Sequence, residues 1–123
     1  MIKLGDFGLA VQLEHSCSKR NSVCGTSWYM GPEVYNEGCC LKSDVWSLGM
    51  SVIEMVEGRH PFVGYNSYQV MKRVCDGDPP SLSSSGLSSD LIDFVSTCLV
   101  KDVEKRSSVN ELLTVVVFER CDD

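Results

Sequence analysis

With 123 residues, 43% of them hydrophobic, the chain has the size of one small domain or of a piece of a larger one. Its 17 acidic residues outnumber its 11 basic ones and give a net charge of −6, which argues against a general nucleic-acid-binding surface. No apolar run is long enough to cross a bilayer and the N-terminus lacks the apolar core of a signal peptide, so we expect a cytoplasmic protein without a membrane partner.

The seven cysteines include no Cys-x-x-Cys spacing, which favours thiols in a reducing compartment over a disulfide framework. His15, Cys17, Cys24 and the pair Cys39–Cys40 lie near one another in the sequence. Their spacings match none of the usual structural zinc sites, so we predict no zinc site there.

At the N-terminus, Ile2 and Leu4 alternate with Lys3 in a short strand-like run that stops at Gly5. The triplet Asp-Phe-Gly follows at residues 6–8, and by itself it fits a strand that ends in a turn through Asp and Gly as well as it fits a functional motif. Residues 14–27 are polar and lack periodicity, which predicts a loop.

The stretch 42–57 predicts the central helix, with Asp44 in its first turn, where a carboxylate can accept backbone N–H bonds. Its apolar residues lie nearly all round the helix, so other elements must wrap it. These residues are Val45, Trp46, Leu48, Met50, Val52, Ile53, Met55 and Val56.

Three further helices are expected after Gly58 ends the central one. Apolar spacing predicts one helix over 66–76 and a second that follows Ser88 or Ser89. Ser108 and Glu111 have capping-box spacing for the last helix. Nothing local stops that helix in the β-branched run 115–118, which would be an aggregation hazard if exposed.

Three motifs stand in a fixed order: Asp-Phe-Gly at 6–8, Gly-Thr-x-x-Tyr-Met-x-Pro-Glu at 25–33 and Ser-Asp-Val-Trp-Ser-Leu-Gly at 43–49. Together they resemble the second half of a protein kinase catalytic domain. The resemblance covers almost the whole chain and implies a mainly α fold, a partial large lobe with a short β-strand remnant at the N-terminus. Residues 1–33 would form the activation segment and 34–123 the helical part of the lobe.

The resemblance also assigns roles to residues near the N-terminus. Asp6 would hold the Mg²⁺ that bridges the ATP phosphates, Phe7 would pack beneath it, and Gly8 would allow the turn. Thr26 would lie where the substrate hydroxyl approaches, which implies serine or threonine targets, or tyrosine as well in a dual-specificity enzyme.

Other residues would have structural roles. Glu33 would pair with Arg106 and so fix the end of the activation segment to the far helices. Asp44 and Trp46, in the third motif, would support the lobe, and Asp44 would steady the backbone of a catalytic loop in an intact kinase. Gly31 replaces the usual alanine before Pro-Glu and adds backbone freedom.

Within protein kinases the chain looks most similar to the MAP kinase kinases and the sterile-twenty-like kinases. Ser18 and Ser22 match the paired phosphorylation sites of the first group, whereas Lys19 to Val23 look more like the second. We rank the first group higher and expect both serines to be phosphorylation sites.

A working kinase also needs a glycine-rich loop, a strand lysine with its glutamate partner, and a His-Arg-Asp loop. None of these is among the 123 residues, so we expect this chain alone to bind ATP and Mg²⁺ weakly, to be inactive and to be marginally stable. Two functions stay open: part of a signalling kinase, with a protein substrate and an upstream kinase as partners, or a truncated kinase that binds a scaffold or other protein without catalysis.

Overall fold

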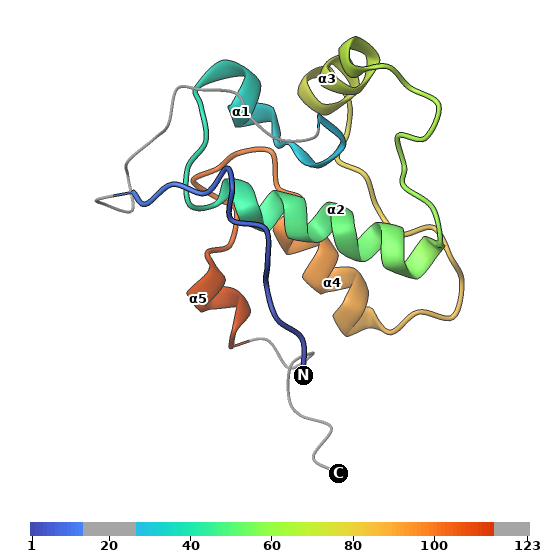
Figure 1. The fold of residues 1–123 in the computed structure, drawn as a ribbon. Coiled ribbons are helices and arrows are strands. Elements are labelled where there is room, and N and C mark those ends of the chain that lie inside the picture. Colours follow the sequence, from blue (N-terminus) through green and yellow to red (C-terminus); the bar gives the residue numbers. More distant parts are fainter. Residues whose placement is uncertain (14–26, 115–123) are drawn as a thin grey trace.

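The computed structural model describes residues 1–13 and 27–114, and these fold around one central helix (Figure 1). The order of elements is the 3-10 helix η1 (Ser27–Tyr29), α1 (Pro32–Asn36), α2 (Ser43–Glu57), α3 (Ser67–Asp76), α4 (Ser89–Cys98) and α5 (Val109–Leu112). In Figure 1, α1 and α3 lie on one side of α2, whereas α4 and α5 lie on the other. The predicted mainly helical fold is confirmed, and the described helices include none long and apolar enough to span a bilayer.

The core forms where α2 packs against α4. Trp46, Met50 and Ile53 of α2 are almost fully buried, and Phe94 and Val95 of α4 are buried with them. Burying each such side chain contributes roughly 1.5–3 kcal/mol, so this contact is the main source of stability.

Gly49 allows the two helices to approach closely. A Cβ at this position would stand 2.8 Å from Cys98 Cβ and 2.9 Å from Leu99 Cδ2, closer than side-chain atoms tolerate. The glycine in the third motif therefore has a packing role in the α2–α4 contact.

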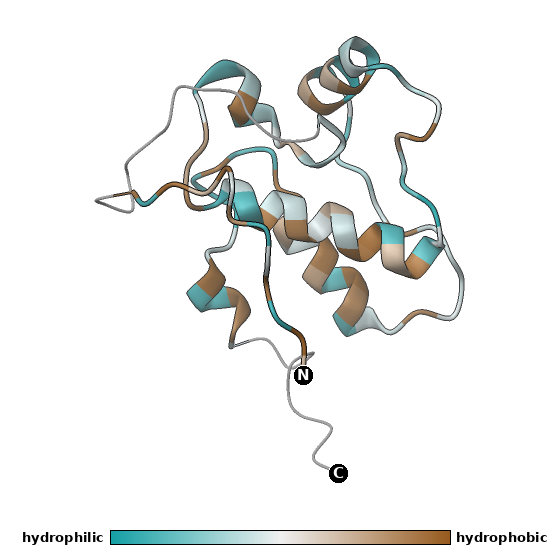
Figure 2. Cartoon of the chain, viewed as in Figure 1, coloured by the Kyte–Doolittle hydropathy of each residue, from teal (hydrophilic) through white to brown (hydrophobic). Residues whose placement is uncertain are grey.

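Two apolar residues of α2 stay open among the described residues: Leu48 is 41% exposed and Met55 is 73% exposed. Val52, which lies between them on the same face because the spacing is four and three residues, is partly buried against the core. Figure 2 shows hydrophobic positions, in brown, along α2 and in the N-terminal segment.

Side-chain caps define where the outer helices begin. Ser88 caps α4, and reciprocal capping boxes start α3 (Asn66 with Gln69) and α5 (Ser108 with Glu111). Gly58 ends α2 in the left-handed conformation, with φ of 74°. The question whether α5 continues into 115–118 falls outside the described residues.

Two details differ from the sequence expectations. The run Ile2 to Gly5 forms no strand, and Ile2 is 98% exposed, because no described segment lies beside it to complete a ladder. Helix α1 was not predicted, since five residues are too few to show a period; Pro32 at its start and Glu33 in its first turn are its only local signals.

Candidate functional site

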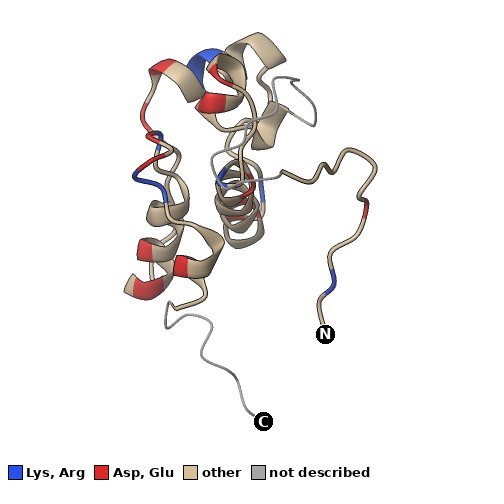
Figure 3. Cartoon of the chain, turned by 90° about the vertical axis from the view of Figure 1, so that its left-hand side faces the viewer, with Lys and Arg blue, Asp and Glu red and all other residues tan. Residues whose placement is uncertain are grey.

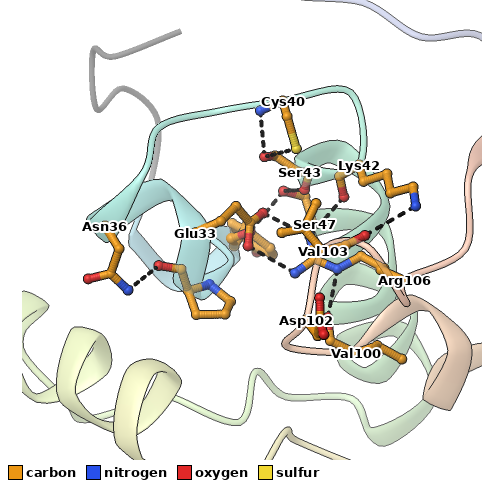
Figure 4. A network of polar contacts seen from close by, with 12 residues as sticks. Glu33, Asn36, Cys40, Lys42, Ser43, Ser47, Val100, Asp102, Val103 and Arg106 are labelled. Carbon is orange, nitrogen blue, oxygen red and sulfur yellow. Dashed lines mark hydrogen bonds and ion pairs between the residues drawn. The ribbon is translucent and has the colours of Figure 1, made fainter. Parts of the chain in front are cut away.

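A buried ion pair joins the start of α1 to the segment after α4 (Figure 4). Arg106 donates to both oxygens of Glu33, from Nη1 to Oε1 at 2.8 Å and from Nη2 to Oε2 at 2.9 Å. The same guanidinium donates to the carbonyl oxygens of Lys42 at 2.9 Å and Val100 at 2.8 Å. Glu33 is 6% exposed and Arg106 is 1% exposed, so the pair expected from the resemblance is present and almost fully shielded from solvent.

The environment of the pair favours the charged form of Glu33. Burial by itself would raise the pKa of Glu33, but the hydrogen bonds and charge of Arg106, with a further bond from Ser43, outweigh it and lower this pKa below its ordinary value. The Arg106 guanidinium also lies 5.2 Å from the centre of the Trp46 ring. Glu33, Trp46 and Arg106 thus connect α1, α2 and the segment after α4.

The residues that directly follow Thr26 are held on the surface of α2. Ser47 donates its hydroxyl to the carbonyl oxygen of Tyr29 at 2.8 Å, and the Tyr29 hydroxyl donates to the Glu54 carboxylate. The ring of Trp28 stacks on His60, with centroids 4.7 Å apart. Residues 27–29 are therefore fixed by side chains from α2 and from the segment after it.

His60 is the centre of this aromatic cluster. It is 2% exposed, its Nδ1 accepts the N–H of Phe62 at 3.0 Å, and its Nε2 finds no hydrogen-bond partner among the described residues. Burial is the main cause that lowers the pKa of His60, although the nearby Glu54 charge acts in the opposite direction. The lowered pKa favours the neutral form of the ring that packs against Trp28.

An open pocket of about 410 Å³ lies between the N-terminal segment and the start of α2. Asp6 and Asp44 contribute carboxylates to its lining, and Met30, Val34 and Leu41 contribute apolar side chains. Asp6 has a φ of 62°, in the left-handed region that non-glycine residues rarely adopt. Such strained backbone is typical of functional positions.

The protein kinase domain family matches residues 1–118. The chain belongs to the protein kinase family. The match includes the pocket lined by Asp6, the segment 27–29 that α2 and His60 hold, and the Glu33–Arg106 pair. These three features are therefore parts of one kinase domain.

Protein kinases generally use ATP with Mg²⁺, and the Asp6 pocket does not provide a complete site for them. Asp6 offers one hard oxygen ligand, but the residues that line the pocket include no lysine or arginine to neutralise phosphate charge. The described residues contain no group of three potential metal ligands. Figure 3 shows acidic residues spread over the helices, and Lys3 is the only basic side chain of the described N-terminal segment.

Some of the residues to which the resemblance gives kinase roles lie in the described part of the chain, and others do not. Asp6 and Gly8 lie in the N-terminal segment with Phe7, which is 66% exposed and so is not packed in the core as the resemblance implies. Asp44 is exposed in the first turn of α2. Thr26, Ser18 and Ser22 lie outside the described residues.

Sequence reasoning missed Ser47, Glu54 and His60, which hold residues 27–29. Ser47 was visible as the polar residue inside the third motif, and Glu54 as a charge in a helix that is otherwise apolar. His60 precedes a proline in a turn, and nothing in the sequence indicates that it is buried.

Proposed function

We propose that this kinase domain transfers the γ-phosphate of ATP to serine or threonine hydroxyls of proteins, and that it acts in a MAP-kinase-type signalling cascade. The observation that carries the proposal is the double attachment of the segment next to Thr26. Ser47 and His60 hold residues 27–29, and the Glu33–Arg106 pair holds the start of α1. A fixed segment is what phosphoryl transfer requires, because catalysis rests on positioning and charge stabilisation.

Within this proposal each predicted residue has a distinct role. Asp6 would ligate Mg²⁺, which neutralises phosphate charge when bound with ATP. Thr26 would stand beside the substrate hydroxyl, one residue before the η1 helix. Phosphates on Ser18 and Ser22 would add about 1.5–2 negative charges each and order the loop against basic groups such as Lys19 and Arg20.

The subgroup assignment rests on the two serines. Their spacing favours a MAP kinase kinase, and this reading extends the substrates to tyrosine in a dual-specificity enzyme. The segment 19–23 supports a sterile-twenty-like kinase instead. Phosphopeptide mapping after pathway stimulation separates the two: phosphate on both Ser18 and Ser22 supports the first.

The second candidate function is a protein-binding module without catalysis. It is favoured by the exposed apolar side chains of Leu48 and Met55 on one face of α2, which could contact another protein, and by the incomplete ATP site. On this reading the partner would be a kinase, a substrate or a scaffold protein.

One experiment distinguishes the two. The endogenous protein is captured with an antibody against residues 103–123, weighed, and assayed for transfer of labelled phosphate from ATP to protein. A species well above 13.6 kDa, with peptides of a strand lysine and a His-Arg-Asp loop, would support the kinase. In that species Asp6→Asn should abolish transfer, whereas Asp93→Asn, on the exposed surface of α4, should leave it unchanged.

A species near 13.6 kDa would support the binding module. The purified 123-residue chain should then transfer no phosphate, because the geometry that supplies about 7–11 kcal/mol of barrier reduction requires groups that these residues lack. Measurable transfer by this chain that is lost in Asp6→Asn would contradict this expectation.

A further inference from the structure

His60 combines deep burial with a hydrogen bond that only its uncharged ring can make. The residue is 2% exposed, and its Nδ1 accepts the Phe62 N–H at 3.0 Å in a buried bond. The His60 carbonyl oxygen accepts the Val63 N–H at 3.2 Å, so side chain and backbone close one turn together. The side-chain bond to the N–H two residues on is the one that an asparagine or aspartate makes in an Asx-turn.

Protonation of the ring removes this acceptor. A neutral imidazole has one nitrogen with a free lone pair, whereas an imidazolium donates from both nitrogens and accepts from neither. Turning the ring over would present a carbon to the Phe62 N–H instead. In both orientations the buried N–H of Phe62 loses its partner, so a charged His60 cannot keep the arrangement that the structure shows.

Ring contacts carry the position of His60 to residue 28. The Trp28 ring stacks on His60, with centroids 4.7 Å apart and planes at 20°, and the Tyr29 ring meets His60 edge-on at 4.9 Å. Tyr29 has a further attachment, because its carbonyl oxygen accepts the Ser47 hydroxyl. A displacement of the His60 ring therefore acts first on Trp28.

The groups on η1 and α2 that face the ring act on its charge in both directions. Burial is the main cause that lowers the pKa of His60, whereas the Glu54 charge and the Trp28 backbone raise it. The Tyr29 hydroxyl donates to the same Glu54 carboxylate. An indole face also attracts a stacked cation. Glu54 and Trp28 thus favour a charged ring that stays in place.

The neighbouring segments add charges of both signs. Arg59 and Glu57 line a pocket together with His60. From α3, Arg73 lies over the Tyr65 ring, which packs one ring beyond Phe62. The two arginines oppose a further positive charge and Glu57 favours it. The lost Phe62 bond then decides, because no ring charge or orientation of an imidazolium restores it.

We propose that His60 is a proton-sensitive anchor for Trp28: the uncharged ring holds the indole, and protonation releases it while Ser47 keeps the Tyr29 backbone in place. The ring takes one proton from solvent on Nδ1, and no other bond is made except hydrogen bonds. Acidification thus changes the surface two residues after Thr26 without unfolding α2 and α4. The anchor does not depend on the kinase activity of the chain.

The test is an NMR titration of the full 123-residue chain from neutral to acid pH. The His60 ring protons report protonation, and the nuclear Overhauser cross-peak between the His60 and Trp28 rings reports the stack. We expect the midpoint below the ordinary value of 6.5. One pH unit below that midpoint the cross-peak should fall to about one tenth, because about one ring in ten is then still neutral.

Two further signals separate a local release from unfolding. A cross-peak between Gly49 and Cys98 should persist through the His60 midpoint, since a Cβ on Gly49 would stand only 2.8 Å from Cys98 Cβ. The Phe62 amide should exchange with solvent at least about tenfold faster once His60 is protonated, after correction for the intrinsic effect of pH.

The variant His60→Asn removes the titration but keeps a side-chain acceptor for the Phe62 N–H. It should keep the Phe62 amide protected over the whole pH range and should abolish the pH dependence of the Trp28 indole N–H resonance. The matched control is His15→Asn, which removes the only other histidine of the chain. In this control the Trp28 resonance should shift with the same midpoint as in the wild type.

Three results would overturn the proposal. One is a His60–Trp28 cross-peak that survives protonation, which would mean that attraction between the cation and the indole outweighs the lost hydrogen bond. Another is loss of this cross-peak and the Gly49–Cys98 cross-peak together, which would mean that acid unfolds the chain as one unit. The third is an unchanged response of Trp28 to pH in His60→Asn.

Discussion

Replacing Arg106 by methionine tests whether the Glu33 pair holds the fold together. The change removes five donors and leaves the Glu33 carboxylate 6% exposed without its cation. Breaking a buried pair by removing one partner costs about 3–5 kcal/mol, because the other charge stays buried. Domains have total stabilities of roughly 5–15 kcal/mol, so Arg106→Met should remove a large part of the stability.

The assay is urea unfolding followed by far-ultraviolet circular dichroism and tryptophan fluorescence. With a slope of about 1–3 kcal/mol per molar urea, we expect the midpoint to fall by at least about 1 M, or the helical signal to be lost without urea. Arg73→Met is the matched control: this exposed arginine lies 4.4 Å from the Tyr65 ring centre and should cost less than about 1 kcal/mol.

The double variant Glu33→Gln/Arg106→Met separates the interaction free energy of the pair from the other effects of each single substitution. Because removal of both charges leaves none buried alone, the double variant should lose about 0.5–3 kcal/mol less than the sum of the single losses. Additive losses, or a cost below about 1 kcal/mol for Arg106→Met, would refute the reasoning.

The Glu33–Arg106 pair should also make the folding stability depend on pH. The folded pKa of Glu33 lies below its ordinary value of 4.5, so its contribution is complete above pH 4.5 and is lost as pH falls through the folded pKa. Glu33→Gln should lack this loss. If Glu33→Gln loses stability at acid pH as much as the wild type does, other carboxylates cause that loss.

Three further predictions concern packing, titration and capping. Gly49→Ala should destabilise by about 1–3 kcal/mol in urea unfolding, because its Cβ would meet Cys98 and Leu99, although alanine is the better helix former; a stabilised variant would contradict the close approach. His60 has its folded pKa lowered from 6.5, so stability should fall as pH drops from 6.5 toward that lower value, and His60→Gln should flatten this part of the curve; equal slopes would exclude His60 as the cause. Asn66→Ala should cost about 1 kcal/mol through loss of the α3 capping box, and a thermal midpoint equal to that of the wild type would show that the box contributes nothing.

Local sequence signals were sufficient to predict where the outer helices begin and where α2 ends. The capping residues Ser88 and Ser108 and the terminating Gly58 act on backbone groups within one turn, so their effects can be inferred without knowing the fold. The motif order was sufficient for the family and for the Glu33–Arg106 pair. The pairing itself spans 73 residues, and only the family resemblance could suggest it before the structure was known.

The sequence by itself determined that this chain is helical, acidic and kinase-like, because those properties depend on periodicity, composition and motif spacing. Tertiary structure decided the rest. The strand-like run at Ile2 forms no strand, since pairing needs a neighbour. His60 becomes a buried ring because Trp28 and Phe62 pack round it, and Cys39 and Cys40 share a pocket with Asp6 because α2 meets the N-terminal segment. Each of these outcomes depends on contacts between segments distant in sequence, which no local pattern records.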